Sequence, residues 1–104
     1  MDWLEKMNKV VDYIEMNLED SIDYEKIGQL VCYSKYHFQR MFPFIAGITI
    51  SEYVRRRRMT LAAFDLQTTK DKVIDIAFKY GYESPDAFSR AFKAVHNIMP
   101  QSAL

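Results

Sequence analysis

Apolar side chains recur at three- and four-residue spacing along almost the whole chain, a pattern typical of amphipathic α-helices that bury one face. The first such stripe predicts a helix over residues 2–17. It consists of Trp3, Leu4, Met7, Val10, Val11, Ile14 and Leu18. No segment alternates apolar and polar residues over the length of a β-strand, and the 104 residues include only three glycines and three prolines. The pattern therefore predicts an all-α fold of about seven helices.

Capping residues divide the following stretch into two short helices. Asp23 is placed to cap a helix that ends near residue 31, and the Ser34 hydroxyl is placed to cap the next helix. Gly47 is suited to end that helix in the left-handed conformation, and Pro43 is expected to shorten or kink it. The residues that these two helices are expected to bury are Ile27, Leu30, Val31, Phe38, Phe42 and Ile45.

The next helix is predicted over residues 49–67 and is apolar on two sides. It begins at a capping box formed by Thr49 and Glu52. At about 100° per residue, one side carries Ile50, Tyr53, Val54, Leu61 and Phe64, and the roughly opposite side carries Met59, Ala62, Ala63 and Leu66. Because both sides must be covered, we expect this helix to connect an N-terminal subdomain (residues 1–48) to a C-terminal subdomain (residues 68–104). Arg57 falls within the first side and is expected to be partly buried and paired with a carboxylate.

Two more helices and a final turn complete the expected fold. Gly81 marks the turn between the helices, Ser84 and Pro85 mark the start of the second one, and Asn97 is suited to cap its end. A last turn begins at Met99–Pro100 and is expected to be cut short by the end of the chain. The expected buried residues of this part are Val73, Ile76, Ala77, Tyr80, Phe88, Ala91, Phe92 and Val95.

The sequence repeats itself at a nearly constant interval. Ile27 recurs 49 positions later, and an extra residue, Glu83, lengthens the second copy by one. The residues that then recur 50 positions later are Ser34, Phe38, Arg40, Phe42 and Ile48, as Ser84, Phe88, Arg90, Phe92 and Ile98. Each copy reads as a short helix, a tight turn and a capped longer helix, which is the pattern of a helix-turn-helix unit. A generic helical bundle has no reason to repeat both turn and cap, so we interpret the chain as two helix-turn-helix units.

The overall charge conceals an uneven distribution. The formal net charge is zero and the pI is about 6.7, whereas nucleic-acid-binding domains are usually basic. Residues 1–34 hold eight acidic and three basic side chains, and residues 35–104 hold six acidic and eleven basic ones. The later segment contains the longer helix of both repeats. It is therefore the part that we expect to meet an anionic partner.

Four segments of the chain resemble the AraC/XylS family of bacterial transcription regulators. They are YSKYHFQRMF at residues 33–42, YVRRRRMT at residues 53–60, DIAFKYGYES at residues 75–84 and FSRAFK at residues 88–93. The resemblance spans residues 4–100 and is closest to the branch that contains MarA, SoxS and Rob. It implies a seven-helix domain that binds asymmetric sites in double-stranded promoter DNA as a monomer and usually activates transcription beside RNA polymerase. An effector-binding domain that follows Leu104 would also fit, as in Rob-like relatives.

Outward positions in the first turns of a recognition helix read base edges in the major groove. In the first unit the resemblance and the helix geometry both indicate Tyr36, Gln39 and Arg40. In the second unit the equivalent positions with polar or charged side chains are Asp86, Ser89 and Arg90. Gln suits adenine and Arg suits guanine, whereas Asp86 departs from the family pattern, so the second unit is expected to read fewer bases. The expected contacts to the DNA backbone are Ser34, Lys35, Arg55, Arg58, Ser84 and Lys93.

Other classes of function fit the sequence less well. An enzyme would need Cys32 as nucleophile and His37 as base, but no third orienting group accompanies them, and a small buried turn residue explains Cys32 better. Neither histidine has metal-ligand spacing with the other or with Cys32, and no cofactor is implied. The stronger alternative is a protein–protein interaction module that uses the same basic helices. A single cysteine and the lack of an 18-residue apolar run predict a cytoplasmic protein without a membrane partner. The resemblance to bacterial transcription regulators implies that it acts in the nucleoid.

Overall fold

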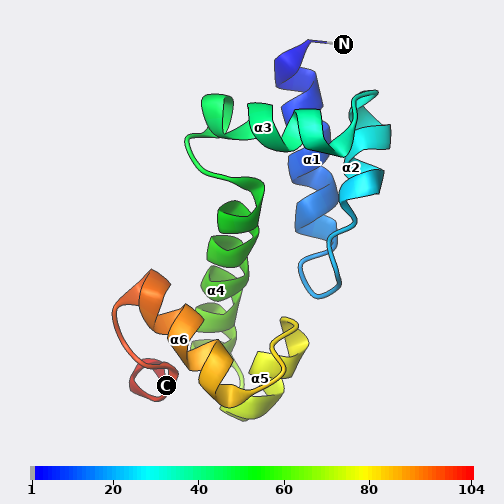
Figure 1. Cartoon of the computed structure of the whole chain (residues 1–104). Helices are drawn as coiled ribbons and strands as arrows, with labels where there is room; N and C mark the ends of the chain where they lie inside the picture. Colours follow the sequence, from blue (N-terminus) through cyan, green and yellow to red (C-terminus); the bar gives the residue numbers. More distant parts are fainter. Residues whose placement is uncertain (1) are drawn as a thin grey trace. The chain divides into compact units, whose positions relative to one another are not determined.

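The computed structural model describes residues 2–104 (Figure 1). All regular secondary structure in these residues is helical. The helices are α1 (Trp3–Met16), α2 (Tyr24–Val31), α3 (Lys35–Ala46), α4 (Ile50–Thr68), α5 (Val73–Lys79), α6 (Pro85–His96) and the 3-10 helix η1 (Pro100–Ala103). The all-α prediction is confirmed. The fold divides into an N-terminal unit, Met1–Val54, and a C-terminal unit, Arg55–Leu104. Residues 50–54 of α4 belong to the first unit and residues 55–68 to the second.

The predicted capping residues define where the helices begin. The Asp23 carboxylate accepts hydrogen bonds from the backbone N–H groups of Glu25 and Lys26 at the start of α2. At the start of α4, Thr49 Oγ1 accepts from the backbone N–H of Glu52 at 3.1 Å. Each such bond satisfies a donor that has no partner within the helix. These boundaries are therefore marked in the local sequence, and at Asp23 the rest of the fold adds to the cap, because its backbone N–H donates to the Tyr13 hydroxyl of α1 at 3.1 Å.

The core of the N-terminal unit follows the predicted stripes with three exceptions. Leu4, in the stripe predicted for the first helix, is 70% exposed. Leu30 is only half-buried, because α2 is rotated so that Gly28 is buried instead. Ile45 is 48% exposed and Phe44 is 85% exposed, so the last turn of α3 extends past the core, and the prediction that Ile45 faces inward is wrong. The buried apolar residues of this unit are Val10, Ile14, Leu18, Ile27, Val31, Phe38, Phe42, Ile50 and Val54.

Helix α4 is not two-sided along its whole length. Ile50 and Val54 are buried in the N-terminal unit, whereas the later residues Met59, Ala62 and Leu66 are buried in the core of the C-terminal unit. The predicted surface is wrong for two residues. They are Leu61, which packs against the C-terminal core, and Phe64, which is 62% exposed. The two apolar surfaces follow one another along the helix because each unit covers only its own end.

Polar bonds reinforce the C-terminal core around α4. The Asp65 carboxylate accepts from the Tyr80 hydroxyl at 2.7 Å and from Lys79 Nζ at 2.9 Å. Burial, and then the bond to Asp65, raises the pKa of Tyr80 to about 12. His96 Nε2 lies 2.8 Å from the backbone oxygen of Met59. These contacts tie α5 and α6 to the same helix, which holds the turn between them in place.

The repeat in the sequence is also a repeat of conformation. Cys32 and Gly81 occupy equivalent turn positions and are both left-handed, with φ of 59° and 85°. Gly47 and Asn97 end α3 and α6, and they too are left-handed, with φ of 83° and 64°. The paired core residues, each at most 1% exposed, are Ile27 and Ile76, Phe38 and Phe88, and Phe42 and Phe92. Each unit therefore contains a short helix, a left-handed turn and a capped longer helix.

The turn positions give a matched test of backbone strain. A non-glycine residue in the left-handed conformation costs roughly 1 kcal/mol, so Cys32→Gly is expected to stabilise the N-terminal unit by about 0.5–1 kcal/mol. Gly81→Ala is expected to destabilise the C-terminal unit by about 1 kcal/mol, because alanine is strained at this positive φ. A steric clash does not contribute, since an added Cβ would meet no atom within 4 Å. Thermal unfolding followed by circular dichroism measures both. Shifts of the same sign would contradict the equivalence of the two turns.

Candidate nucleic-acid interface

Two serine caps fix the starts of the helices that carry the candidate contacts. Ser34 Oγ accepts from the backbone N–H of His37 at 3.1 Å, and Ser84 Oγ accepts from that of Ala87 at 3.1 Å. Each hydroxyl oxygen is therefore used within its helix, and the hydroxyl proton is left to donate outward. The backbone N–H groups of the first turn that have no partner within the helix lie at its N-terminus, which is also the positive end of the helix dipole. Both helix starts are suited to an anionic group.

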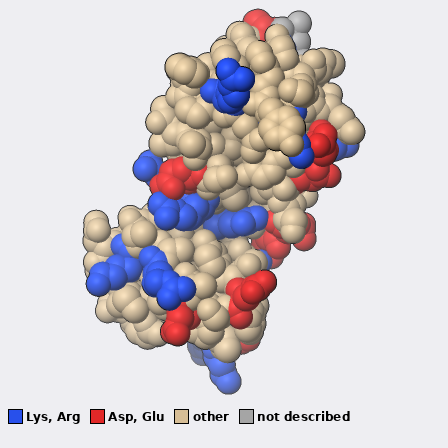
Figure 2. Space-filling model, viewed as in Figure 1, with Lys and Arg blue, Asp and Glu red and all other residues tan. Residues whose placement is uncertain are grey.

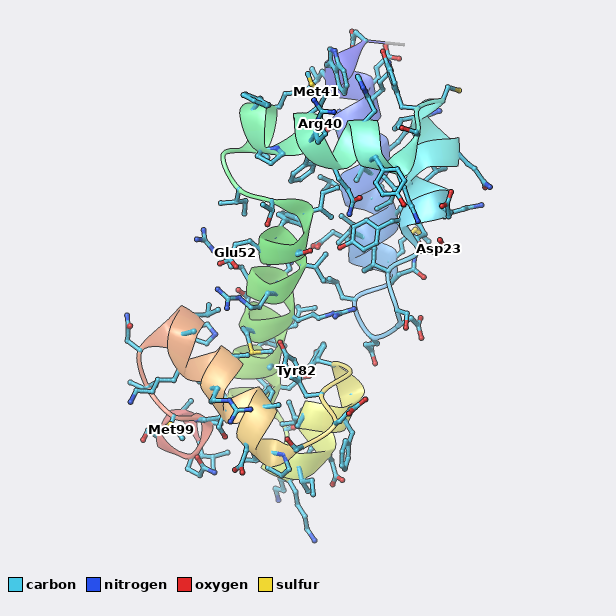
Figure 3. The ribbon with its side chains drawn as sticks, viewed as in Figure 1. Asp23, Arg40, Met41, Glu52, Tyr82 and Met99 are labelled. Atoms are coloured by element: carbon cyan, nitrogen blue, oxygen red, sulfur yellow. The ribbon has the colours of Figure 1, made fainter. Side chains whose placement is uncertain are left out.

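The outward strip of α3 is made of the residues that the sequence indicated. Tyr36 is 69% exposed, Arg40 is exposed one turn later, and Gln39 is half-buried beside them. Figure 3 labels Arg40 on this helix. The opposite side of α3 carries the buried rings of Phe38 and Phe42, whose centroids lie 6.1 Å apart. The packing of these rings fixes the rotation of the helix about its axis, so the strip faces solvent.

In the C-terminal unit the candidate residues of α6 line one open hollow of about 400 Å³, whereas Ser84, Arg55 and Arg58 do not. Its lining residues are Pro85, Asp86, Ser89, Arg90, Lys93, Met99 and Gln101. Lysine and arginine side chains gather over α6 in Figure 2. The last turn is predicted from the sequence, but the place of Gln101 and Met99 in this hollow is not. Their equivalents in the first copy, Ser51 and Thr49, lie at the start of a long helix, so the repeat did not indicate a turn that folds onto α6.

Lys35 lies at the entrance of α3 but is not a free cation. Its Nζ lies 3.0 Å from the Glu25 carboxylate and 5.1 Å from the centroid of the Tyr36 ring. The hydrogen bond to Glu25 and its charge raise the pKa of Lys35. These residues also line a hollow of about 320 Å³ between α2 and α3. Lys35 and Tyr36 are predicted from the sequence, whereas the contact with Glu25 is not.

The arginine run of α4 is split between different environments, as its helical spacing requires. Arg56 is exposed, and Arg57 is half-buried as expected. Arg55 and Arg58 are half-buried near Tyr82, whose ring lies beside α4 in the turn before α6 (Figure 3). Burial raises the pKa of Tyr82, and the positive charges of Arg58 and Arg55 oppose that rise. A phosphate contact by either arginine stays a prediction, as does the carboxylate partner of Arg57.

Cys32 and His37, the two residues that an enzyme would need, lie on the surface. Cys32 is exposed, so the prediction of a small buried turn residue is wrong: the left-handed turn projects its side chain away from the core. The His37 ring stacks on Tyr33 with centroids 4.7 Å apart. Within residues 2–104, no group of three or more His, Cys, Asp or Glu side chains could hold a metal ion. None of the described helices is long and apolar enough to span a membrane.

Comparisons with known proteins agree on one kind of domain. A family model described as a helix-turn-helix domain matches residues 27–104. Over 94 residues the chain is 43% identical to the HTH-type transcriptional activator AarP of Providencia stuartii, covering 90% of this chain and 70% of AarP. It is 35% identical to the multiple antibiotic resistance protein MarA of Escherichia coli (strain K12), covering 90% of this chain and 74% of MarA.

The fold is similar to that of solved structures of the same kind. A transcriptional regulator with an AraC-type DNA-binding domain from Chromobacterium violaceum superimposes with a TM-score of 0.88 at 26% identity, covering 96% of this chain and 89% of that one. The double helix-turn-helix arrangement predicted from the repeat is confirmed by this likeness.

Proposed function

The chain belongs to the AraC/XylS family of DNA-binding transcription regulators, a non-enzymatic family, and we propose that α3 and α6 read two adjacent major grooves of one promoter duplex. The observation that carries the proposal is the repeated, capped helix with an exposed arginine at the equivalent position, Arg40 and Arg90. Recognition helices of helix-turn-helix proteins use these outward residues near the N-terminus. Two such helices fit half-sites about one helical turn, 10–10.5 base pairs, apart.

The base-reading roles follow from the chemistry of each side chain. On α3, the Arg40 guanidinium suits the O6/N7 edge of guanine and the Gln39 amide suits adenine, while Tyr36 can pack on a thymine methyl group. On α6, Arg90 is the strongest candidate, because the Asp86 carboxylate suits chiefly the N4 amino group of cytosine and otherwise repels phosphate. The remaining side chains proposed to meet bases or phosphates are Ser34, Arg55, Arg58, Ser84, Ser89 and Lys93, whereas Lys35 is paired with Glu25.

We further propose that the protein acts as a monomeric activator beside RNA polymerase. The two units carry different outward residues, so a single chain can read an asymmetric site without a symmetric partner. The relative AarP is described as a transcriptional activator, which supports the direction of regulation. Reporter expression from a promoter that carries the selected site would test this part separately from DNA binding.

Selection of bound sequences from random duplex DNA tests the proposed function, and Arg40→Ala tests its residue assignment. We expect the variant to lose about 1–3 kcal/mol of binding free energy on the selected site, about 5- to 160-fold in affinity, and to relax preference at one or two base pairs. Equilibrium binding to the selected and to a scrambled duplex measures both effects. Lys9→Ala, which removes an exposed charge from α1, is the matched control.

The control separates base reading from general charge. Lys9→Ala should weaken both duplexes slightly and equally. If Arg40→Ala weakened both duplexes to the same degree, Arg40 would not read a base. If the random pool yielded no enriched sequence and no duplex affinity, the basic helices would have another partner, and an acidic protein would be the first candidate.

A further inference from the structure

The contact between Glu25 and Lys35 reduces the positive charge at the N-terminal end of α3. Lys35 Nζ lies 3.0 Å from a carboxylate oxygen of Glu25, and the two side chains are 31% and 67% exposed. An ion pair this exposed contributes little to the stability of a fold. Its larger effect is on local charge, because the only other lysine or arginine of α3 is Arg40. With Lys35 neutralised, Arg40 is the single uncompensated cation of the helix.

The same ammonium group also touches the base-reading strip. Lys35 Nζ lies 5.1 Å from the centroid of the Tyr36 ring, within the range of a cation–π contact. Tyr36 is 69% exposed, so few other atoms restrain its ring. Glu25 therefore holds Lys35, and Lys35 in turn restrains Tyr36. The three residues come from two helices, α2 and α3, whose approach is fixed by the tight turn between them.

We propose that Glu25 is a specificity-determining residue that withholds Lys35 from DNA phosphates and keeps it against Tyr36. This inference rests on the proposed function. A lysine that meets a phosphate adds affinity for every sequence alike, whereas base contacts discriminate. By removing one sequence-independent contact from the α3 entrance, Glu25 lowers affinity for every duplex alike. By keeping Lys35 against Tyr36 it also holds a base-reading side chain in place, and this second effect favours the cognate site alone.

Glu25→Gln is the variant that tests the proposal, because it keeps the shape of the side chain and removes its charge. We expect tighter binding to random duplex at low salt and a smaller ratio between cognate and random affinity. One additional phosphate contact makes the slope of log K against log salt steeper by about 0.9. Between 50 and 200 mM salt, that slope adds a further loss of about 3.5-fold in affinity. Titration of both duplexes at several salt concentrations measures the slope and the ratio.

Two further variants separate this contact from the general effect of removing an acid. Glu19→Gln removes an exposed acid of the same unit and should leave the slope unchanged. Lys35→Gln alone should leave the salt slope nearly unchanged, because Lys35 is paired with Glu25 and makes no phosphate contact, although the carboxylate it leaves unpaired should lower affinity slightly for every duplex. In the double variant Glu25→Gln/Lys35→Gln the gain should disappear. Thermal unfolding of each variant reports whether the N-terminal unit remains folded.

Three results would overturn the inference while leaving the proposed function intact. The first is a full one-phosphate loss of slope in Lys35→Gln alone, which would mean that Lys35 already meets DNA. The second is a gain from Glu25→Gln that persists in the double variant, and the third is an equal gain from Glu19→Gln. Absence of duplex binding by the unaltered chain would instead overturn the proposed function itself.

Discussion

Phe92→Ala is expected to lower the free energy of unfolding of the C-terminal unit by about 3–5 kcal/mol. The Phe92 side chain is fully buried. The centroid of its ring lies 5.8 Å from that of Phe88 and 4.5 Å from that of His96. Its removal leaves a cavity and loosens His96, whose Nε2 contacts the backbone of Met59 on α4. Urea unfolding followed by circular dichroism measures the change.

The repeat supplies the matched comparison. Phe42 is the equivalent residue of the N-terminal unit, is 1% exposed, and packs on Phe38 and Tyr53, so Phe42→Ala should cost that unit a similar amount. Phe44→Ala, two residues along the same helix at an 85% exposed position, should change stability by less than about 0.5 kcal/mol. A loss from Phe44→Ala as large as that from Phe42→Ala would show that the buried face of α3 is assigned wrongly.

Local chemistry explains which parts of the fold could be predicted. The caps at Asp23, Ser34 and Ser84 and the left-handed ends at Gly47 and Asn97 depend on a few neighbouring residues, and all five are confirmed. Periodicity, by contrast, gives the direction of a side chain and not what covers it. Ile45 and Phe64 lie in helices at apolar positions and are nevertheless exposed, because no periodicity shows where the packed elements end.

The candidate interface shows the same division. The outward positions of Tyr36, Arg40 and Arg90 follow from the repeat and from the buried rings opposite them. Glu25 was missed because its contact with Lys35 joins two helices and depends on how closely they approach. Gln101 was missed for a similar reason, since it meets the α6 hollow only when η1 folds back on that helix. Contacts that need tertiary structure are absent from one-dimensional patterns.

The double variant Arg40→Ala/Arg90→Ala is expected to lose about 2–6 kcal/mol of binding free energy on the selected site, about 30-fold to more than 10⁴-fold in affinity. Each arginine is expected to contribute about 1–3 kcal/mol, and contributions of distant, independent residues add. Arg40 and Arg90 occupy equivalent exposed positions in separate units, which is why no shared partner should couple them. Equilibrium binding of both single variants and the double variant to one duplex measures the sum.

A second duplex, in which the half-site read by α6 is scrambled, shows whether both helices bind at once. On this duplex Arg90→Ala should lose only the small, sequence-independent part of its effect, whereas Arg40→Ala should keep its full effect. The two-groove proposal thus predicts that the cost of Arg90→Ala depends on the second half-site and that the cost of Arg40→Ala does not. If Arg90→Ala had no effect even on the intact site, α6 would contribute no base contact through Arg90, and recognition would rest on the α3 strip of Tyr36, Gln39 and Arg40.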